Sequence, residues 1–363
     1  MGDIFDYIYW RGDLDFNQVL FNEVDNLIFS RLSYLPFENI INNNERLTIE
    51  ECFQKSLNFK EDMFLCKNDF KLFKVLAESK RFGGLCLSNF IHEIDYKLEQ
   101  QFAALSIDLP GDCLYVAFRG TDDSFVGWKE DFNMIFLDTI PGQKKALLYL
   151  NNIEVDDNTK VIVGGHSKGG NLAIYASVNA KKEIKNKIIS VYNNDGPGFL
   201  EDTMDDENYK EIEKKIHSFI PQTSIIGRLL NNNDNYLVVN SSEKFILQHD
   251  LYSWKIERDD LVYLEEIDDN SRRINKIVSE WLSKISLEER EKFVNILYNV
   301  LISSNIRTFR EIDTKWYIGA KNIIKKYRNI SKEDKIVLDK VIDYLVASIK
   351  TNIFTKKSIL KKR

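Results

Sequence analysis

The chain has 363 residues, of which 44% are hydrophobic and 29% charged, proportions typical of a soluble globular protein with one large domain and an appendage. Its formal net charge of −6 is uneven, because residues 251–363 hold 24 Lys and Arg against 17 Asp and Glu, which leaves −13 on residues 1–250. The acidic region argues against a nucleic-acid partner, and the change of sign predicts a boundary near Arg258.

The spacing of the cysteines and the length of the apolar segments indicate the cellular compartment of the protein. Cys52, Cys66, Cys86 and Cys113 lack the close spacing of a metal site, so we expect reduced core thiols in a reducing compartment. The first residues lack a basic region followed by an apolar run, and no apolar run approaches the length of a membrane span. We therefore predict a cytoplasmic protein without metal or cofactor.

The first 82 residues are expected to form a mostly helical N-terminal arm packed on the core. Helices are predicted over residues 22–35, 48–60 and 69–79. Asn22 is a plausible N-cap for the first helix, and Pro36 is expected to end it. Thr48 and Glu51 have the spacing of a capping box at the start of the second helix.

Residues 83–255 alternate between strand-like and helix-like segments, which predicts an α/β domain with a mostly parallel sheet flanked by helices. A β-hairpin is expected from Gln101–Asp108 and Cys113–Phe118, joined by a turn at Pro110. Further strands are predicted at residues 161–164, 188–192, 216–220 and 236–239, and helices at residues 143–153 and 171–180.

Residues 256–363 are predicted to form a helical C-terminal region. Ser286 with Glu289 has the pattern of a capping box, and Ser331 is placed to cap a second helix. The chain ends in a basic tail, which we interpret as a solvated terminus, with contact to an anionic membrane surface or a partner as the alternative. The basic residues of this tail are Lys356, Lys357, Lys361, Lys362 and Arg363.

The segment Gly165-His166-Ser167-Lys168-Gly169 fits the G-x-S-x-G pattern of a nucleophile elbow. A serine raised above the end of a strand sits on a strained turn, so the residues two positions away must lack side chains. The strand before Ser167 and the apolar helix after it provide the expected context. Ser167 is therefore the candidate nucleophile, and the backbone N–H of Lys168 is expected to form half of an oxyanion hole.

A serine nucleophile needs a general base, and the chain has only four histidines. His92 lies before the elbow in the chain, and His217 lies inside a predicted strand. His166 occupies the variable position of the elbow and is expected to point away from the base. His249 follows the last predicted strand, where the histidine of an α/β-hydrolase is expected, and is the candidate base.

The sequence offers more than one candidate for the acid that orients the histidine. Asp195 directly follows a predicted strand and precedes a Gly-Pro-Gly turn, although an aspartate is also common there for turn chemistry alone. Asp234 is the second candidate, in a very polar segment. Asp250 adjoins His249 and would not reach its ring productively. Thr121, at the end of another predicted strand, is a candidate second oxyanion donor.

Residues 122–142 mix large apolar side chains with polar ones directly after Thr121. Such a segment beside an esterase site can act as a lid over an acyl pocket. The alternative interpretation is that these side chains belong to the core. The residues that would line or cover the substrate groove are Phe125, Trp128, Met134, Phe136 and Leu137.

These motifs resemble those of the fungal-type, class 3 lipases, and more closely those of a bacterial, Mbeg-like family of hydrolases. The stretches that carry the resemblance are Phe21–Asp25, Ala117–Thr121, Trp128, Asp131, Gly165–Gly170, Asp195–Phe199, Ile220–Ser224 and Gln248–Asp250. The resemblance implies Ser167 as nucleophile, His249 as base, and Thr121 with Lys168 as oxyanion donors. Class 3 lipases usually place their acid in a later loop, where residues 222–225 offer no carboxylate. Either Asp195 substitutes for it or the triad is incomplete.

The sequence therefore predicts a serine hydrolase that cleaves an ester or thioester of a hydrophobic acyl group, with a small-molecule or lipid-like ester as substrate. The alternative is a hydrolase fold retained as a binding or regulatory module. The missing late-loop acid and the helical appendage favour the alternative, and the nucleophile, base and oxyanion stretches favour the enzyme.

Overall fold

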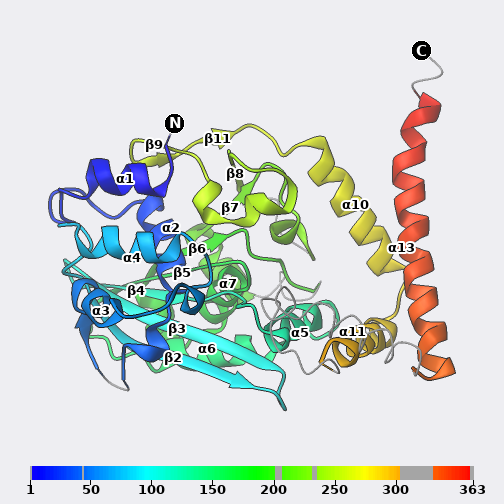
Figure 1. Cartoon of the computed structure of the whole chain (residues 1–363), viewed down its shortest axis with the longest axis horizontal. Coiled ribbons are helices and arrows are strands. Elements are labelled where there is room, and N and C mark those ends of the chain that lie inside the picture. Colours follow the sequence, from blue (N-terminus) through cyan, green and yellow to red (C-terminus); the bar gives the residue numbers. More distant parts are fainter. Residues whose placement is uncertain (1, 43–44, 201–206, 231–234, 303–329, 360–363) are drawn as a thin grey trace.

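A mixed nine-stranded sheet forms the centre of the protein, as shown by the computed structural model in Figure 1. The structure describes residues 2–42, 45–200, 207–230, 235–302 and 330–359. The strand order is β1-β2-β3-β4-β5-β6-β7-β8-β11, and β4 to β8 pair in parallel. The strands are Leu47–Thr48 (β1), Cys86–Asp95 (β2), Gln100–Leu109 (β3), Cys113–Phe118 (β4), Lys160–His166 (β5), Ile188–Asn194 (β6), Ile216–Pro221 (β7), Leu237–Val239 (β8), Ile256–Glu257 (β9), Asp260–Leu261 (β10) and Tyr263–Leu264 (β11).

Helices cover both faces of this sheet, so the predicted α/β-hydrolase core is confirmed. Side chains alternate along β4: Tyr115 and Ala117 join one buried cluster with α1–α4, and Val116 and Phe118 join another with α6, α7 and α9. The α-helices are Ile4–Arg11 (α1), Glu23–Leu32 (α2), Ile49–Ser56 (α3), Asp69–Ala77 (α4), Phe125–Asn133 (α5), Pro141–Asn151 (α6), Lys168–Asn179 (α7), Lys182–Lys187 (α8), Glu207–Ile212 (α9), Asp269–Ser283 (α10), Leu287–Ile302 (α11) and Lys332–Ile359 (α13).

The predicted N-terminal helices are present, with small differences at their ends. Asn22 caps α2 through its side chain, and Thr48 and Glu51 form the capping box of α3. Helix α2 ends at Leu32, before Pro36, because Ser33 closes the last turn with backbone and side-chain hydrogen bonds to the preceding carbonyls. The predicted hairpin of β3 and β4 is also confirmed.

Two segments differ from the sequence prediction. Strand β2 was not predicted, because a bulge between Ser88 and Ile91, with Asn89 at a φ of 52°, interrupts its alternation. The prediction that residues 256–363 are helical is wrong for the segment that forms β9, β10 and β11. Arg258 there takes a left-handed conformation, which turns the chain back into a short hairpin, and β11 then pairs with the sheet edge β8.

Buried ion pairs hold the N-terminal helices on the sheet. Arg31 of α2 donates to both carboxylate oxygens of Asp69 in α4, at 2.6 and 2.7 Å. Arg81 pairs with Asp25 of α2, and both side chains are fully buried. Because each charge is compensated by a close partner, these pairs fix the helices in one arrangement.

The C-terminal helices begin where the sequence predicts. Ser286 and Glu289 exchange the two hydrogen bonds of a capping box at α11, and Ser331 accepts from the Asp334 N–H at the start of α13. No helix in the described segments combines the length and apolar character needed to cross a bilayer. Lys361, Lys362 and Arg363 of the basic tail lie outside the described residues, so its role stays a prediction.

Candidate active site

Ser167 occupies the turn between β5 and α7, with φ 58° and ψ −132°. The two glycines of the motif are required by close backbone approach: a Cβ at Gly165 would lie 2.4 Å from the Gly169 carbonyl group, and a Cβ at Gly169 would lie 2.1 Å from the Phe118 oxygen. The Ser167 N–H donates to the Asn194 carbonyl at 3.0 Å, which ties the turn to β6. Ser167 thus has the strained backbone of a nucleophile elbow.

Asp195 and His249 meet although 54 residues separate them in the chain, and His249 Nδ1–H donates to Asp195 Oδ2 at 2.6 Å. Asp195 follows β6, adopts a φ of 52° and is 1% exposed. Its other oxygen, Oδ1, accepts from the Ser224 hydroxyl at 2.6 Å and the Gly227 N–H at 3.1 Å. The carboxylate is therefore fixed, with one oxygen left for the histidine. The sequence analysis did not predict that Ser224 and Gly227 would bind the carboxylate of Asp195.

His249 lies at the end of a short 3₁₀-helix, Phe245–His249, and its imidazole is partly exposed. His166 contacts it directly, with ring centroids 4.4 Å apart, so the expectation that His166 points away from the base is wrong. The Ser167 hydroxyl makes no hydrogen bond to His249 among the described residues. Such contacts are often loose before substrate binds.

His166 connects the elbow to the backbone of His249. Its Nε2–H donates to the His249 carbonyl at 2.7 Å, so its Nδ1 is unprotonated and can accept from the Tyr34 hydroxyl, 3.0 Å away. Burial, and secondarily the neighbouring His249, hold the pKa of His166 well below its usual value. His166 is therefore neutral, and its hydrogen bond ties the His249 backbone to the end of β5.

The two candidate oxyanion donors come from different segments: Lys168 directly follows Ser167, and Thr121 follows Gly120 at the end of β4. Gly120 packs against the elbow turn so closely that an added Cβ would lie 3.1 Å from Ser167 Cβ. The Thr121 hydroxyl donates to Asp131 Oδ2 at 2.6 Å, which fixes the Thr121 side chain. The Lys168 N–H belongs to the first turn of α7, whose amides have no acceptor within the helix.

The Lys168 side chain has a separate role that the sequence did not indicate. Its ammonium group is buried and donates to Glu130 Oε2 at 2.7 Å and to the carbonyl and side-chain oxygens of Gln101 at 2.8 and 2.7 Å. Glu130 also accepts from the Gly142 N–H at 2.7 Å. This network anchors α5 to the start of α7.

The five predicted lid residues differ in their exposure to solvent. Phe125 and Met134 are buried, Phe136 is partly buried, and Trp128 and Leu137 are exposed. Met134 and Leu137 line a narrow cavity of about 10 Å³ whose other apolar walls are Ile140, Phe199, Leu200 and Leu230. The segment after α5 therefore packs against these apolar side chains and leaves only a small cavity between them.

The 3₁₀-helix before His249 exposes three consecutive apolar side chains, Phe245, Ile246 and Leu247, each at least half exposed. Phe245 has a φ of 52°. Apolar side chains exposed next to a candidate base are a feature that sequence periodicity does not detect.

The other candidate residues do not join this cluster. His217 lies in β7, and burial lowers its pKa. Asp250 caps the next 3₁₀-helix by accepting from the Tyr252 N–H, so its carboxylate is engaged away from the His249 ring. Asp234 lies outside the described residues. His92 belongs to a separate cavity, described below.

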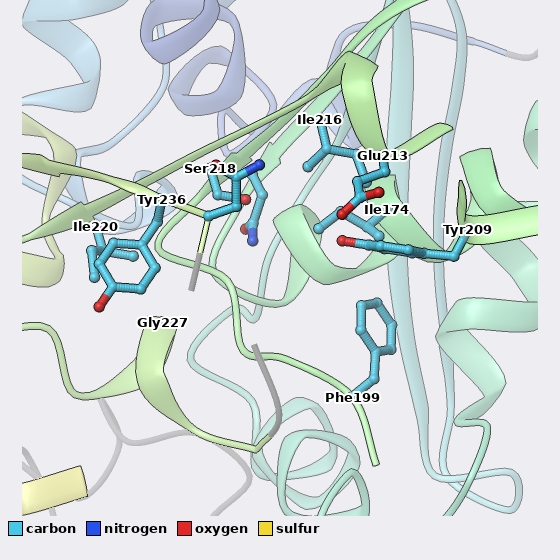
Figure 2. A pocket seen from close by; sticks show the side chains of 11 residues that line it. Ile174, Phe199, Tyr209, Glu213, Ile216, Ser218, Ile220, Gly227 and Tyr236 are labelled. Atoms are coloured by element: carbon cyan, nitrogen blue, oxygen red, sulfur yellow. The ribbon is translucent and has the colours of Figure 1, made fainter. Parts of the chain in front are cut away.

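A small cavity of about 20 Å³ lies beside Asp195, because Gly227, which donates to Asp195, is part of its wall. Figure 2 shows its other walls, among them Ile174, Phe199 and Tyr209. This volume holds about one water molecule. It is too small for an acyl chain.

The sheet, the elbow and the position of Asp195 after the neighbouring strand define the fold of the chain as the α/β-hydrolase fold. The Mbeg1-like family model matches residues 76–299, more than half of the chain. The protein therefore belongs to the Mbeg1-like family.

No curated protein matches the chain significantly. Among solved structures, it is similar to M37 lipase, at 16% identity and a TM-score of 0.38 over 58% of this chain and 71% of that one. It is also similar to Rhizomucor miehei lipase in a propeptide complex, at 14% identity and a TM-score of 0.35 over 61% of this chain and 69% of that one. A lipase from Rhizopus microsporus var. chinensis is similar at 19% identity and a TM-score of 0.29, over 65% of this chain and 87% of that one. Similarity at this level is too low to transfer an activity or a site residue.

Proposed function

We propose that this protein is a serine hydrolase that cleaves an ester or thioester of a hydrophobic acyl group through an acyl-enzyme. The observation that carries the proposal is the 2.6 Å contact between His249 Nδ1 and Asp195 Oδ2, formed beside a strained elbow serine. Three separate chain segments supply the nucleophile, base and acid that acyl transfer needs.

In this mechanism, the Ser167 oxygen attacks the acyl carbon and His249 Nε2 takes the serine proton. Asp195 keeps the other imidazole nitrogen protonated and stabilises the positive charge that forms on the ring. The proton then passes to the departing alcohol or thiol, and water releases the acyl group by the same route. The N–H groups of Thr121 and Lys168 would stabilise the oxyanion.

The surroundings of the site support an apolar acyl group. Trp128 and Phe132 of α5 and Phe245–Leu247 next to His249 are exposed apolar side chains. Because removing apolar side chains from water lowers the free energy, these side chains favour the binding of a hydrophobic substrate. Since buried polar contacts anchor α5, we propose that a lid would involve the following segment, residues 134–140, rather than the helix.

A fluorophosphonate probe tests the proposal directly, because it reacts with an activated serine. We expect the wild type to be labelled, Ser167→Ala to remain unlabelled, and His249→Asn to lose at least about a hundredfold in labelling rate. The matched control is Ser283→Ala in α10, an exposed serine away from the site, which should be labelled like the wild type. No labelling of the wild type would favour the alternative, a hydrolase fold that only binds or regulates.

A further inference from the structure

A cavity of about 270 Å³ lies on the other side of the elbow from Asp195. Strands β4 and β6 flank β5, so the loop after β4 approaches Ser167 from one side and Asp195 approaches it from the other. Tyr34 and Arg119 line this cavity and adjoin Gly120, where an added Cβ would meet both the Tyr34 hydroxyl and Ser167. The cavity is therefore next to the nucleophile turn.

The guanidinium of Arg119 is unsatisfied in this cavity. Arg119 is 4% exposed, its Nε is buried without a hydrogen-bond partner, and its guanidinium donates no hydrogen bond among the described parts of the chain. Its terminal nitrogens lie 3.8 Å from carboxylate oxygens of Glu38 and Asp122, beyond hydrogen-bond distance. Buried donors without acceptors are uncommon in proteins. The guanidinium therefore points to a ligand with an acceptor oxygen.

Carboxylates outnumber basic side chains in the wall of the cavity, and those of Glu38 and Asp122 lie nearest to Arg119. Four carboxylates line the cavity, against the single guanidinium of Arg119. Burial and then Arg119 lower the pKa of His92, whose buried Nε2 also lacks a partner, so this imidazole adds no charge near neutral pH. The carboxylates are those of Glu38, Asp62, Asp122 and Asp123.

Charge excludes the simpler ligands. A purely anionic group would meet the guanidinium but would be repelled by the surrounding carboxylates, and a purely cationic group would leave the Arg119 donors unpaired. A neutral group could accept a hydrogen bond from Arg119 but would bring no positive charge to the carboxylates. Tyr34 and Tyr96 add aromatic surface, which attracts an organic cation.

We infer that this cavity binds a zwitterionic part of the substrate, with its anionic oxygen on Arg119 and its cationic nitrogen among the carboxylates. The inference rests on the proposed function, because the cavity would hold this group of an ester whose acyl carbon lies at Ser167. A phosphodiester-linked amine and an amino-carboxylate share this chemistry. The substrate class is therefore an acyl ester with a zwitterionic head.

The test compares ligands that share one acyl chain and differ in head-group charge, at concentrations below micelle formation. Calorimetry on Ser167→Ala measures binding without turnover. Octanoylglycerophosphocholine should bind at least about tenfold more tightly than octanoylglycerol or octanoylglycerol phosphate. Octanoylcarnitine, compared with octanoylcholine, tests a carboxylate as the anionic group. A preference for either zwitterion supports the inference and identifies the source of the anion.

Variants then assign the preference to the cavity. Arg119→Gln should remove the advantage of the zwitterion over octanoylglycerol, and Asp122→Asn, at a more exposed position, should weaken it if the arginine variant does not fold. Arg46→Gln, an exposed arginine paired with Asp108, is the matched control and should keep the full preference. Equal affinity for the zwitterionic and neutral ligands would overturn the inference.

The two proposals fail separately. Hydrolysis of all the esters without a head-group preference would overturn the zwitterion site and leave the serine hydrolase intact. Selective binding without labelling or turnover would leave the site intact and overturn the hydrolase.

Discussion

Asp195 supplies the sharpest prediction at the scale of single residues. Asp195→Asn keeps the size of the side chain but removes the charge that holds Nδ1–H of His249 and stabilises the imidazolium. We expect kcat for an acyl ester to fall about 10⁴-fold, with KM little changed. The reason is that the interaction is needed chiefly in the transition state.

Asp250→Asn is the matched control for this measurement, because Asp250 adjoins His249 but caps the next 3₁₀-helix. Its kcat should stay within a few-fold of the wild type. If Asp250→Asn and Asp195→Asn lowered kcat equally, the acid would be wrongly assigned.

The buried carboxyl group of Asp131 should make the stability of the folded protein depend on pH. Burial raises the pKa of this carboxyl to about 6, although Lys168 and the Thr121 hydroxyl oppose the shift. The folded state therefore binds the proton more tightly than the unfolded state. This contribution to stability is complete below about pH 4 and is lost as pH rises through 6, at a cost of about 3 kcal/mol.

Asp131→Asn removes this titration. Urea unfolding at several pH values should show that the wild type loses more stability than Asp131→Asn between pH 4 and 6.5. The same pH dependence in both proteins would show that the carboxyl does not titrate in this range. The neighbouring Glu130 cannot serve as a control, because Glu130→Gln would also break the ion pair between Glu130 and Lys168.

At the scale of elements, the structure separates what local pattern determines from what it does not. The elbow was predictable because it needs residues without side chains two positions before and after Ser167. The position of Asp195 was predictable because a parallel strand ends just before it. The contacts of Ser224 with Asp195 and of His166 with His249 join distant segments, so no local pattern encodes them. The open donors of Arg119 likewise depend on tertiary packing.

Secondary structure follows the same division. Caps such as those of Asn22 and Ser286 are local and were predicted. Strand β2 was missed because its bulge breaks the period on which strand prediction depends, and β9 to β11 because short edge strands depend on their pairing partners.

The segment after α5 allows a test of the lid. Phe136 is partly buried, and the Lys129 ammonium lies 5.6 Å from its ring centroid. If residues 134–140 form a lid, Phe136→Ser should change the preferred acyl-chain length with little effect on thermal stability. If Phe136 belongs to the core, the substitution should cost about 3 kcal/mol of unfolding free energy and leave turnover per folded molecule unchanged.

Thermal unfolding and the chain-length profile are measured together on Phe136→Ser. Leu148→Ser, an exposed leucine of α6, is the control for simple loss of surface apolar area. A large fall in melting temperature with an unchanged chain-length profile would exclude the lid.

At the scale of the whole molecule, one buried apolar cluster links the N-terminal helices to the sheet and to the hairpin after Trp254. It contains Ile4 of α1, Ile28 of α2, Tyr115 of β4 and Leu261 of β10. The domain boundaries that the sequence predicts, near residues 82 and 255, both cross this cluster. We therefore expect residues 2–261 to unfold together, because either part alone would expose an apolar face.

The pair of Arg81 with Asp25 tests this expectation away from the active site. Arg81→Met leaves a buried carboxylate without its partner, and should lower the free energy of unfolding by about 3 kcal/mol. If the N-terminal helices and the sheet form one cooperative unit, near-ultraviolet circular dichroism and fluorophosphonate labelling should be lost in a single transition at a lower temperature.

The double variant Asp25→Leu/Arg81→Met, which removes both charges, should recover part of the lost stability. Two separate transitions, with labelling retained after the first, would instead make residues 1–82 an independent arm, because Ser167 would then remain activated on a sheet without its N-terminal cover.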